Sequence, residues 1–156
     1  MGNCIRIDLT AENFVEEKLL SGVAPMVDEN CIYYWDRTSH LLYRCDLDGK
    51  NRERFLNEPI GYNNFDDEYF YYKIYSDIRY DPQHPDNFDI YRTPKDDPTK
   101  VEKIATLPET IGGIYTVPGT GKIFVENYLR DSSVKPVIYV MNTDGSDLKK
   151  LELPEA

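Results

Sequence analysis

Short runs of alternating apolar and polar residues recur along the whole chain, and turn-forming residues separate them. The clearest runs are rich in Tyr, Ile, Val and Phe, as in Cys31–Asp36 and Lys122–Tyr128. These residue types suit the pleated, half-buried surface of a β-sheet. No long segment has the spacing of an amphipathic helix, so the pattern predicts an all-β, antiparallel fold.

The runs belong to a repeat of about 48 residues. The segments Tyr43–Asp46, Tyr91–Pro94 and Tyr139–Asn142 occupy equivalent places in it, and Ile5–Asp8 precedes them as a further copy. Repeats of roughly 40–50 residues that contain several short strands are typical of propeller blades. The repeat therefore predicts four-stranded antiparallel blades. A β-sandwich is the alternative, although a sandwich needs no internal repeat.

Each complete repeat divides into four expected strands, and together the repeats predict a single partial β-propeller domain over residues 1–156. We expect a half blade at 1–20 and blades at 21–57, 58–108 and 109–156. The expected strands of the three blades are Ala24–Asp28, Cys31–Asp36, Leu41–Asp46 and Arg52–Leu56, then Tyr62–Phe65, Tyr69–Tyr75, Phe88–Thr93 and Lys100–Ala105, then Ile114–Val117, Lys122–Tyr128, Val137–Met141 and Leu148–Leu153.

The first twenty residues match only the second half of the repeat. Cys4–Leu9 corresponds to a third strand and Phe14–Leu20 to a fourth. A short helix is the alternative for Phe14–Leu20, because it contains residues that favour helices. About three and a half blades fall short of the roughly four to eight blades of closed propellers. We therefore expect either half of a homodimeric propeller or a fragment of a larger one.

One blade resembles a known type. Cys31–Asp36, followed by Leu42–Asn51 and Phe55-Leu56, resembles a YWTD-type blade of the six-bladed propellers related to the low-density lipoprotein receptor. It is also similar to bacterial propeller-like domains of unknown function. Trp35-Asp36 lacks the Thr that separates Trp from Asp in the motif, and the later blades match loosely. Because the motif residues of that family hold the blade together, the resemblance implies a fold and no catalytic activity.

The chain is acidic, with a net charge of −10. Nucleic-acid binding needs Lys and Arg to displace counterions from phosphate, and anionic membrane surfaces also attract basic residues. We therefore expect neither nucleic acid nor a membrane as a partner. An acidic surface keeps a Tyr-rich protein soluble and leaves cationic partners open.

The three cysteines, Cys4, Cys31 and Cys45, include no CxxC pair. Their odd number and spacing predict free thiols in a reducing compartment. No secretory signal is visible in the first twenty residues, which also favours the cytoplasm. A fragment excised from a secreted protein would lack a signal as well, so the compartment stays open.

Motifs for catalysis or cofactor binding fail on their spacing. Pro118–Lys122 is similar to a phosphate-binding loop, but Thr116 stands where the first Gly belongs. Asp46–Asn51 and Asn142–Asp147 are similar to calcium loops, but their glycines come two positions early. All three segments are predicted to be turns. We expect no catalytic residue, no metal ligand and no cofactor.

The expected inner strands carry polar and aromatic residues that suit binding. In a propeller these strands line the central channel, and here they contain Tyr62, Asn63, Asn64 and Tyr115. The residues predict a non-catalytic binding or scaffolding module with a protein or peptide partner of unknown identity. A hydrolase or lyase with its active site in the channel is the alternative. It would need acids and histidines that converge from several inner strands, and these strands contain few acids and no His.

The segment Ser76–Asn87 departs from the repeat as an insertion of 12 residues, and it contains Tyr80 and His84. Insertions in repeat folds collect on one face, often the binding face. We therefore add Tyr80 and His84 to the expected binding residues. A neutral insertion is the alternative, because surface loops tolerate added length at little cost.

Overall fold

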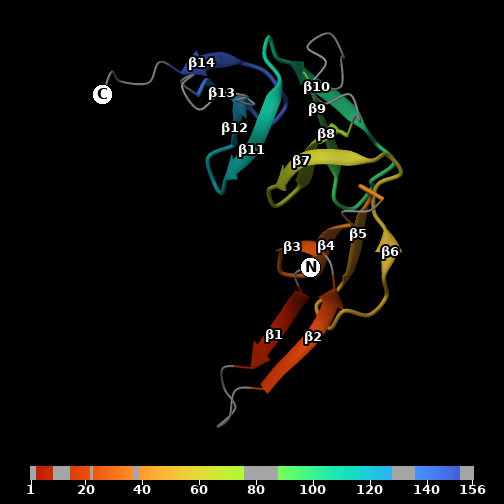
Figure 1. The fold of residues 1–156 in the computed structure, drawn as a ribbon. Coiled ribbons are helices and arrows are strands. Elements are labelled where there is room, and N and C mark those ends of the chain that lie inside the picture. The colour runs from red at the N-terminus through yellow and green to blue at the C-terminus, as the bar shows by residue number, and fades with distance from the viewer. Residues whose placement is uncertain are drawn as a thin grey trace. The chain divides into compact units, whose positions relative to one another are not determined.

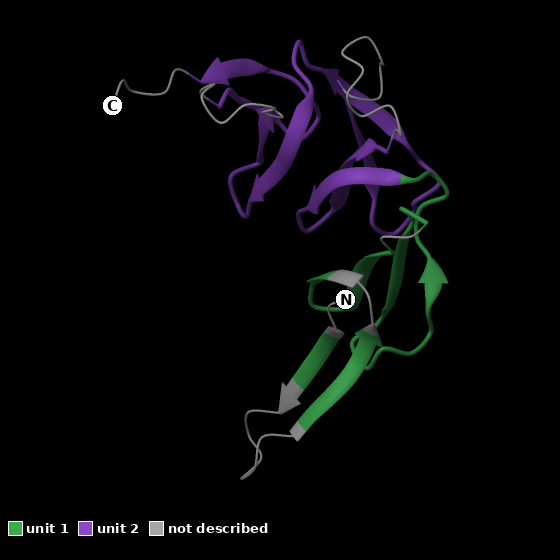
Figure 2. Cartoon of the chain, viewed as in Figure 1, with its two compact units in different colours: residues 1–59 green, residues 60–156 purple. Residues whose placement is uncertain are grey.

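The computed structural model describes residues 3–8, 15–21, 23–36, 39–75, 88–127 and 136–151. Every regular element within these ranges is a β-strand. Accordingly, the described residues include no helix long and apolar enough to cross a membrane. Contacts divide the chain into two compact units, Met1–Pro59 and Ile60–Ala156 (Figure 1, Figure 2).

The first unit contains a two-stranded and a four-stranded antiparallel sheet. The half blade consists of β1 (Asn3–Asp8) and β2 (Val15–Ser21). β2 covers most of the segment for which a short helix was the alternative, and it is a strand as predicted. The first blade follows, with its strands side by side in chain order: β3 (Val23–Val27), β4 (Cys31–Asp36), β5 (Leu42–Asp46) and β6 (Glu53–Arg54).

The second unit contains two four-stranded antiparallel sheets, again in chain order. This confirms the partial propeller of a half blade and three blades. The second blade has β7 (Ile60–Phe65), β8 (Tyr69–Ile74), β9 (Asp89–Pro94) and β10 (Glu102–Thr106), and the third blade has β11 (Ile111–Val117), β12 (Lys122–Asn127), β13 (Ile138–Asn142) and β14 (Lys149–Leu151).

The fourth strand of the first blade is shorter than the sequence predicts. β6 ends at Arg54, whereas the predicted strand continues to Leu56. Phe55 and Leu56 are buried, and the N–H groups of both donate to the carbonyl oxygen of Leu42, at 2.8 and 3.3 Å. The chain therefore leaves the sheet ladder to bury these two side chains.

Side chains close the turns between the strands. The Asp28 carboxylate accepts hydrogen bonds from the N–H groups two and three residues further on, and Asp66 does the same in the second blade. Such a turn satisfies backbone donors that have no strand partner. Gly49 and Gly145 adopt φ angles of +77° and +83° between the third and fourth strands of their blades. These positions confirm that the two calcium-loop-like segments are turns.

Each unit has its own apolar core. The three cysteines are free thiols, and Cys45 lies in the first core with Cys4 packed against it. Burial raises the pKa of the Cys45 thiol, so it behaves as an apolar side chain. The first core comprises Leu19, Leu20, Ile32, Tyr34 and Cys45, and the second comprises Tyr71, Ile90, Leu107, Ile111, Ile114, Ile123, Val125, Tyr139 and Met141.

Candidate functional site

The inner strands of the second and third blades, β7 and β11, are neighbours within the second unit (Figure 1). Two side chains join them. Asn64 Nδ2 donates to the carbonyl oxygen of Ile114 at 3.3 Å, and Thr116 Oγ1 donates to the carbonyl oxygen of Phe65 at 2.6 Å. These bonds fix the spacing of the two blades where their inner strands meet.

Two tyrosines on these strands stay open to solvent. Tyr62 on β7 is 42% exposed and Tyr115 on β11 is 49% exposed. The Tyr115 hydroxyl donates to Glu126 Oε2 at 3.1 Å, and Lys73 Nζ lies 5.6 Å from the centre of the Tyr62 ring. Partial burial, Glu126 and the nearby Tyr62 raise the pKa of Tyr115. Both rings are therefore held by a charged neighbour, and Tyr115 keeps its proton.

Two glycines make room for these side chains. A Cβ atom at Gly113 would lie 2.7 Å from the Tyr115 hydroxyl oxygen, and one at Gly61 would lie 2.9 Å from Cε of Lys73. Both glycines precede the expected strands, which start at Tyr62 and Ile114, but they lie within β7 and β11. Glycine in a strand often marks a close approach of another group, and here that group is a side chain of the same surface.

The other expected binding residues are placed differently. Asn63 donates to a carbonyl oxygen of its own strand at 3.0 Å. Asn64 is engaged in the contact between blades. Tyr80 and His84, with the whole segment Ser76–Asn87, lie outside the described residues. Of the six expected residues, the structure thus brings Tyr62 and Tyr115 together on one surface.

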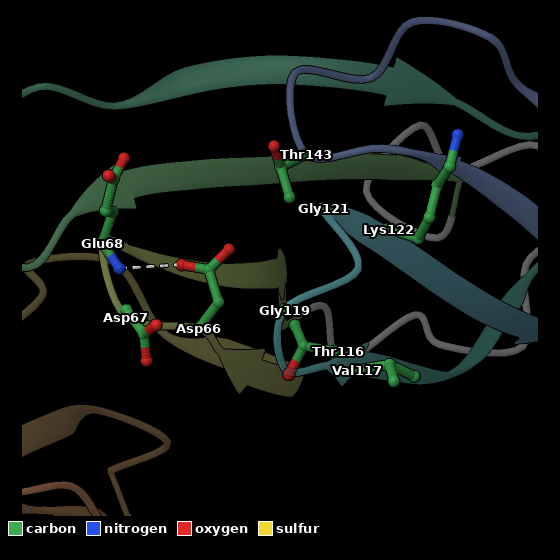
Figure 3. A pocket seen from close by; sticks show the side chains of 9 residues that line it. All are labelled: Asp66, Asp67, Glu68, Thr116, Val117, Gly119, Gly121, Lys122 and Thr143. Carbon is green, nitrogen blue, oxygen red and sulfur yellow. Dashed lines mark hydrogen bonds between the residues drawn. The ribbon is translucent and has the colours of Figure 1, made fainter.

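A pocket of about 300 Å³ opens at the C-terminal ends of the same two inner strands (Figure 3). It lies between the second and third blades, where the turns after β7, β11 and β13 meet. Residues from widely separated parts of the sequence form it, so no local motif indicates it. Its lining consists of Asp66, Asp67, Glu68, Thr116, Val117, Gly119, Gly121, Lys122 and Thr143.

Carboxylates dominate one side of the pocket (Figure 3). Asp66 is already engaged, because its Oδ2 accepts a hydrogen bond from the hydroxyl of buried Tyr71 at 2.5 Å. Asp67 and Glu68 are exposed, and neither side chain forms an ion pair with any described residue. Lys122, on the opposite side, donates to a neighbouring amide oxygen at 2.6 Å. The pocket can therefore accept a cationic or hydrogen-bond-donating group.

Among the described residues, no three or more His, Cys, Asp or Glu side chains are grouped so that they could hold a metal ion.

Comparison with known proteins bears on the fold. No family model and no curated protein matches the sequence. The structure is similar to a chain from a crystal structure of a nidogen/laminin complex, with a TM-score of 0.65 and 15% sequence identity. The match covers 96% of this chain and 57% of that chain, so this chain spans little more than half of its length. At this identity the likeness shows the β-propeller fold alone.

Proposed function

We propose that this chain is a non-catalytic β-propeller module, with blades of the YWTD type, that binds a protein or peptide partner. The exposed pair of Tyr62 and Tyr115 carries the proposal. The fold buries other tyrosines almost completely, including Tyr33, Tyr71 and Tyr72. Tyrosine is enriched at protein interfaces, and interface hot spots are enriched in Tyr, Trp and Arg.

The pair is suited to binding because its rings are already fixed. The Tyr115 ring lies over Gly113 and its hydroxyl is hydrogen-bonded to Glu126, while Tyr62 packs against Lys73, a residue that is only 5% exposed. A partner that contacts these rings loses little additional side-chain freedom. Preorganisation of this kind raises affinity by lowering the entropic cost of association.

The acidic charge of this surface indicates that the partner segment carries a basic side chain. The chain has a net charge of −10, and Asp67 and Glu68 face the pocket beyond the tyrosine pair. Val117 lines this pocket and is two residues from Tyr115 on the same strand, so the two places adjoin. A partner segment with an apolar side chain over the tyrosines and a Lys or Arg side chain at the pocket fits this surface. The presence of a similar propeller in a nidogen/laminin complex supports a protein partner.

Selection from a library of random peptides displayed on phage tests the proposal. We expect the selected peptides to combine an aromatic or aliphatic residue with Lys or Arg. For a synthetic peptide chosen in this way, fluorescence anisotropy should show that Tyr62→Ala and Tyr115→Ala each weaken binding about tenfold or more, as for interface anchors.

Val101→Ala is the matched control, because Val101 is equally exposed, at 48%, and directly precedes β10, the strand at the opposite edge of its blade from β7. It should leave peptide binding unchanged, and circular dichroism should show that all three variants stay folded. Failure to select any peptide, or equal binding by the double variant without both tyrosines, would contradict the proposed function.

A further inference from the structure

The inner strands β7 and β11 offer a partner their side chains rather than a free backbone edge. Each is the end strand of its own sheet, and the two lie next to each other (Figure 1). The carbonyl oxygens of Ile114 and Phe65, however, already accept hydrogen bonds from Asn64 and Thr116 across the two blades. A strand added to this edge would compete with these bonds, whereas recognition through side chains leaves them in place.

The two exposed tyrosine rings are suited to an uncharged group. Lys73 Nζ already lies 5.6 Å from the centre of the Tyr62 ring, and a second cation on this ring would be repelled by the first. The Tyr115 hydroxyl already donates to Glu126. The rings therefore accept a neutral, apolar group, and a basic side chain of the partner belongs in the acidic pocket.

We propose that the partner segment is a proline-rich polyproline II helix, which places a proline ring on Tyr62 and Tyr115 and a Lys or Arg side chain in the pocket lined by Asp67 and Glu68. This inference rests on the proposed function and names the class of its partner. A polyproline II helix has no internal hydrogen bonds and needs no strand to pair with. Its preformed shape lowers the entropic cost of binding, and aromatic-lined surfaces recognise such segments.

The distance along β11 sets the spacing of the two side chains in the partner. The Tyr115 ring reaches back over Gly113, because a Cβ atom there would lie 2.7 Å from the Tyr115 hydroxyl oxygen. From the ring to Val117, at the edge of the pocket, is thus about three strand residues, or about 10 Å. A polyproline II helix rises about 3.1 Å per residue and has about three residues per turn. A basic residue three positions from the proline therefore spans this distance on the same face of the helix.

Fluorescence anisotropy with synthetic peptides tests the inference. The probe is a labelled proline-rich peptide in which Arg stands three positions after a proline. We expect about tenfold weaker binding when that proline is replaced by Ala, and when the Arg is replaced by citrulline, its neutral isostere. A peptide in which one inserted alanine moves the Arg a position further should also bind more weakly, because the Arg then lies on another face of the helix.

Variants of the protein assign each effect to its place on the surface. Asp67→Asn combined with Glu68→Gln should abolish the preference for Arg over citrulline. Tyr62→Ala should weaken the binding of both peptides and keep that preference. Glu58→Gln is the matched control, because Glu58 is an exposed acid of the first unit, and it should change neither.

Two outcomes would overturn the inference. One is equal binding of the proline and alanine peptides, with Tyr62→Ala still harmful, and it would leave the proposed function intact. The other is a preference for Arg that survives in the double variant of Asp67 and Glu68, which would place the basic side chain elsewhere. Failure of every peptide, including those selected from the random library, to depend on the tyrosines would instead contradict the proposed function itself.

Discussion

The backbone of Gly145 packs directly against the carbonyl oxygen of Ile104, so that a Cβ atom added at Gly145 would lie 2.0 Å from that oxygen. Gly145 lies in the turn between β13 and β14, and Ile104 lies in β10, the outer strand of the preceding blade. Two repeat lengths earlier, a Cβ atom at Gly49 would lie 3.4 Å from Leu19 of β2. The Asp-Gly turn of a blade therefore contacts the outer strand of the blade before it.

Gly145→Ala should destabilise the fold strongly. The left-handed φ of +83° costs a non-glycine residue about 1–2 kcal/mol, and the overlap with Ile104 adds about 1–3 kcal/mol. Gly119→Ala is the matched control, because φ is +73° but no atom lies within 4 Å of the added Cβ. Urea denaturation should give a clearly larger loss at Gly145. Equal losses would show that the contact with Ile104 contributes nothing.

Trp35→Ala should also be costly. Trp35 is partly buried, and its ring centre lies 5.3 Å from that of His40. Removal of a large packed aromatic side chain typically costs about 3–5 kcal/mol. Trp35→Phe should cost clearly less, because it retains a ring. If denaturation shows a loss below about 1 kcal/mol for Trp35→Ala, the stabilising role implied by the YWTD resemblance is wrong.

Asn64→Ala should loosen the contact between the second and third blades. The substitution removes the donor to the Ile114 carbonyl and the acceptor for the N–H of Phe65, at 2.8 Å. Loss of partners for partly buried backbone groups costs about 1–3 kcal/mol. Asn57→Ala, at an exposed position, serves as the control and should leave the unfolding midpoint in place. A neutral Asn64→Ala would mean that water replaces both bonds.

Alkaline pH should destabilise the chain partly through Tyr33. Burial, assisted by Asp28, raises the pKa of Tyr33 to about 12, whereas tyrosine in an unfolded chain titrates at about 10. The unfolded state therefore releases this proton first, and the stability conferred by neutral Tyr33 is complete below pH of about 10 and lost as pH rises towards about 12.

Urea denaturation across this pH range should show that Tyr33→Phe weakens the fall in unfolding free energy. Tyr62→Phe, at an exposed ring, is the control and should keep the wild-type fall. The same slope for Tyr33→Phe and the wild type would exclude Tyr33 as a source of the alkaline sensitivity.

Strand positions could be predicted from sequence because alternation and the repeat act together. β4 covers the same residues as the predicted strand Cys31–Asp36. The starts of the inner strands are less accurate, because the predicted strands begin at Tyr62 and Ile114, just after Gly61 and Gly113, whereas β7 and β11 begin at Ile60 and Ile111. The reason for glycine at these positions is a neighbouring side chain, which the local sequence does not reveal.

The candidate site could be predicted only in part. Tyr62 and Tyr115 lie on expected inner strands, so their place on neighbouring strands follows from the repeat. The role of Asn64 depends on which carbonyl of the next blade lies opposite it, and that depends on packing. The pocket could not be predicted, because it forms only when the turns around Asp66, Gly119 and Thr143 come together.

The turn of the second blade is built differently, and this affects how the chain can be divided. Asp97 and Pro98 stand between β9 and β10 where the other two blades have an Asp-Gly turn. The contact of Gly49 lies within the first compact unit, the contact of Gly145 lies within the second, and the units separate after Pro59. A genetic cut between Pro59 and Ile60 would therefore leave both glycine contacts whole. Tyr62 and Tyr115 both lie on the Ile60–Ala156 side of such a cut, so an excised second unit would keep the tyrosine pair.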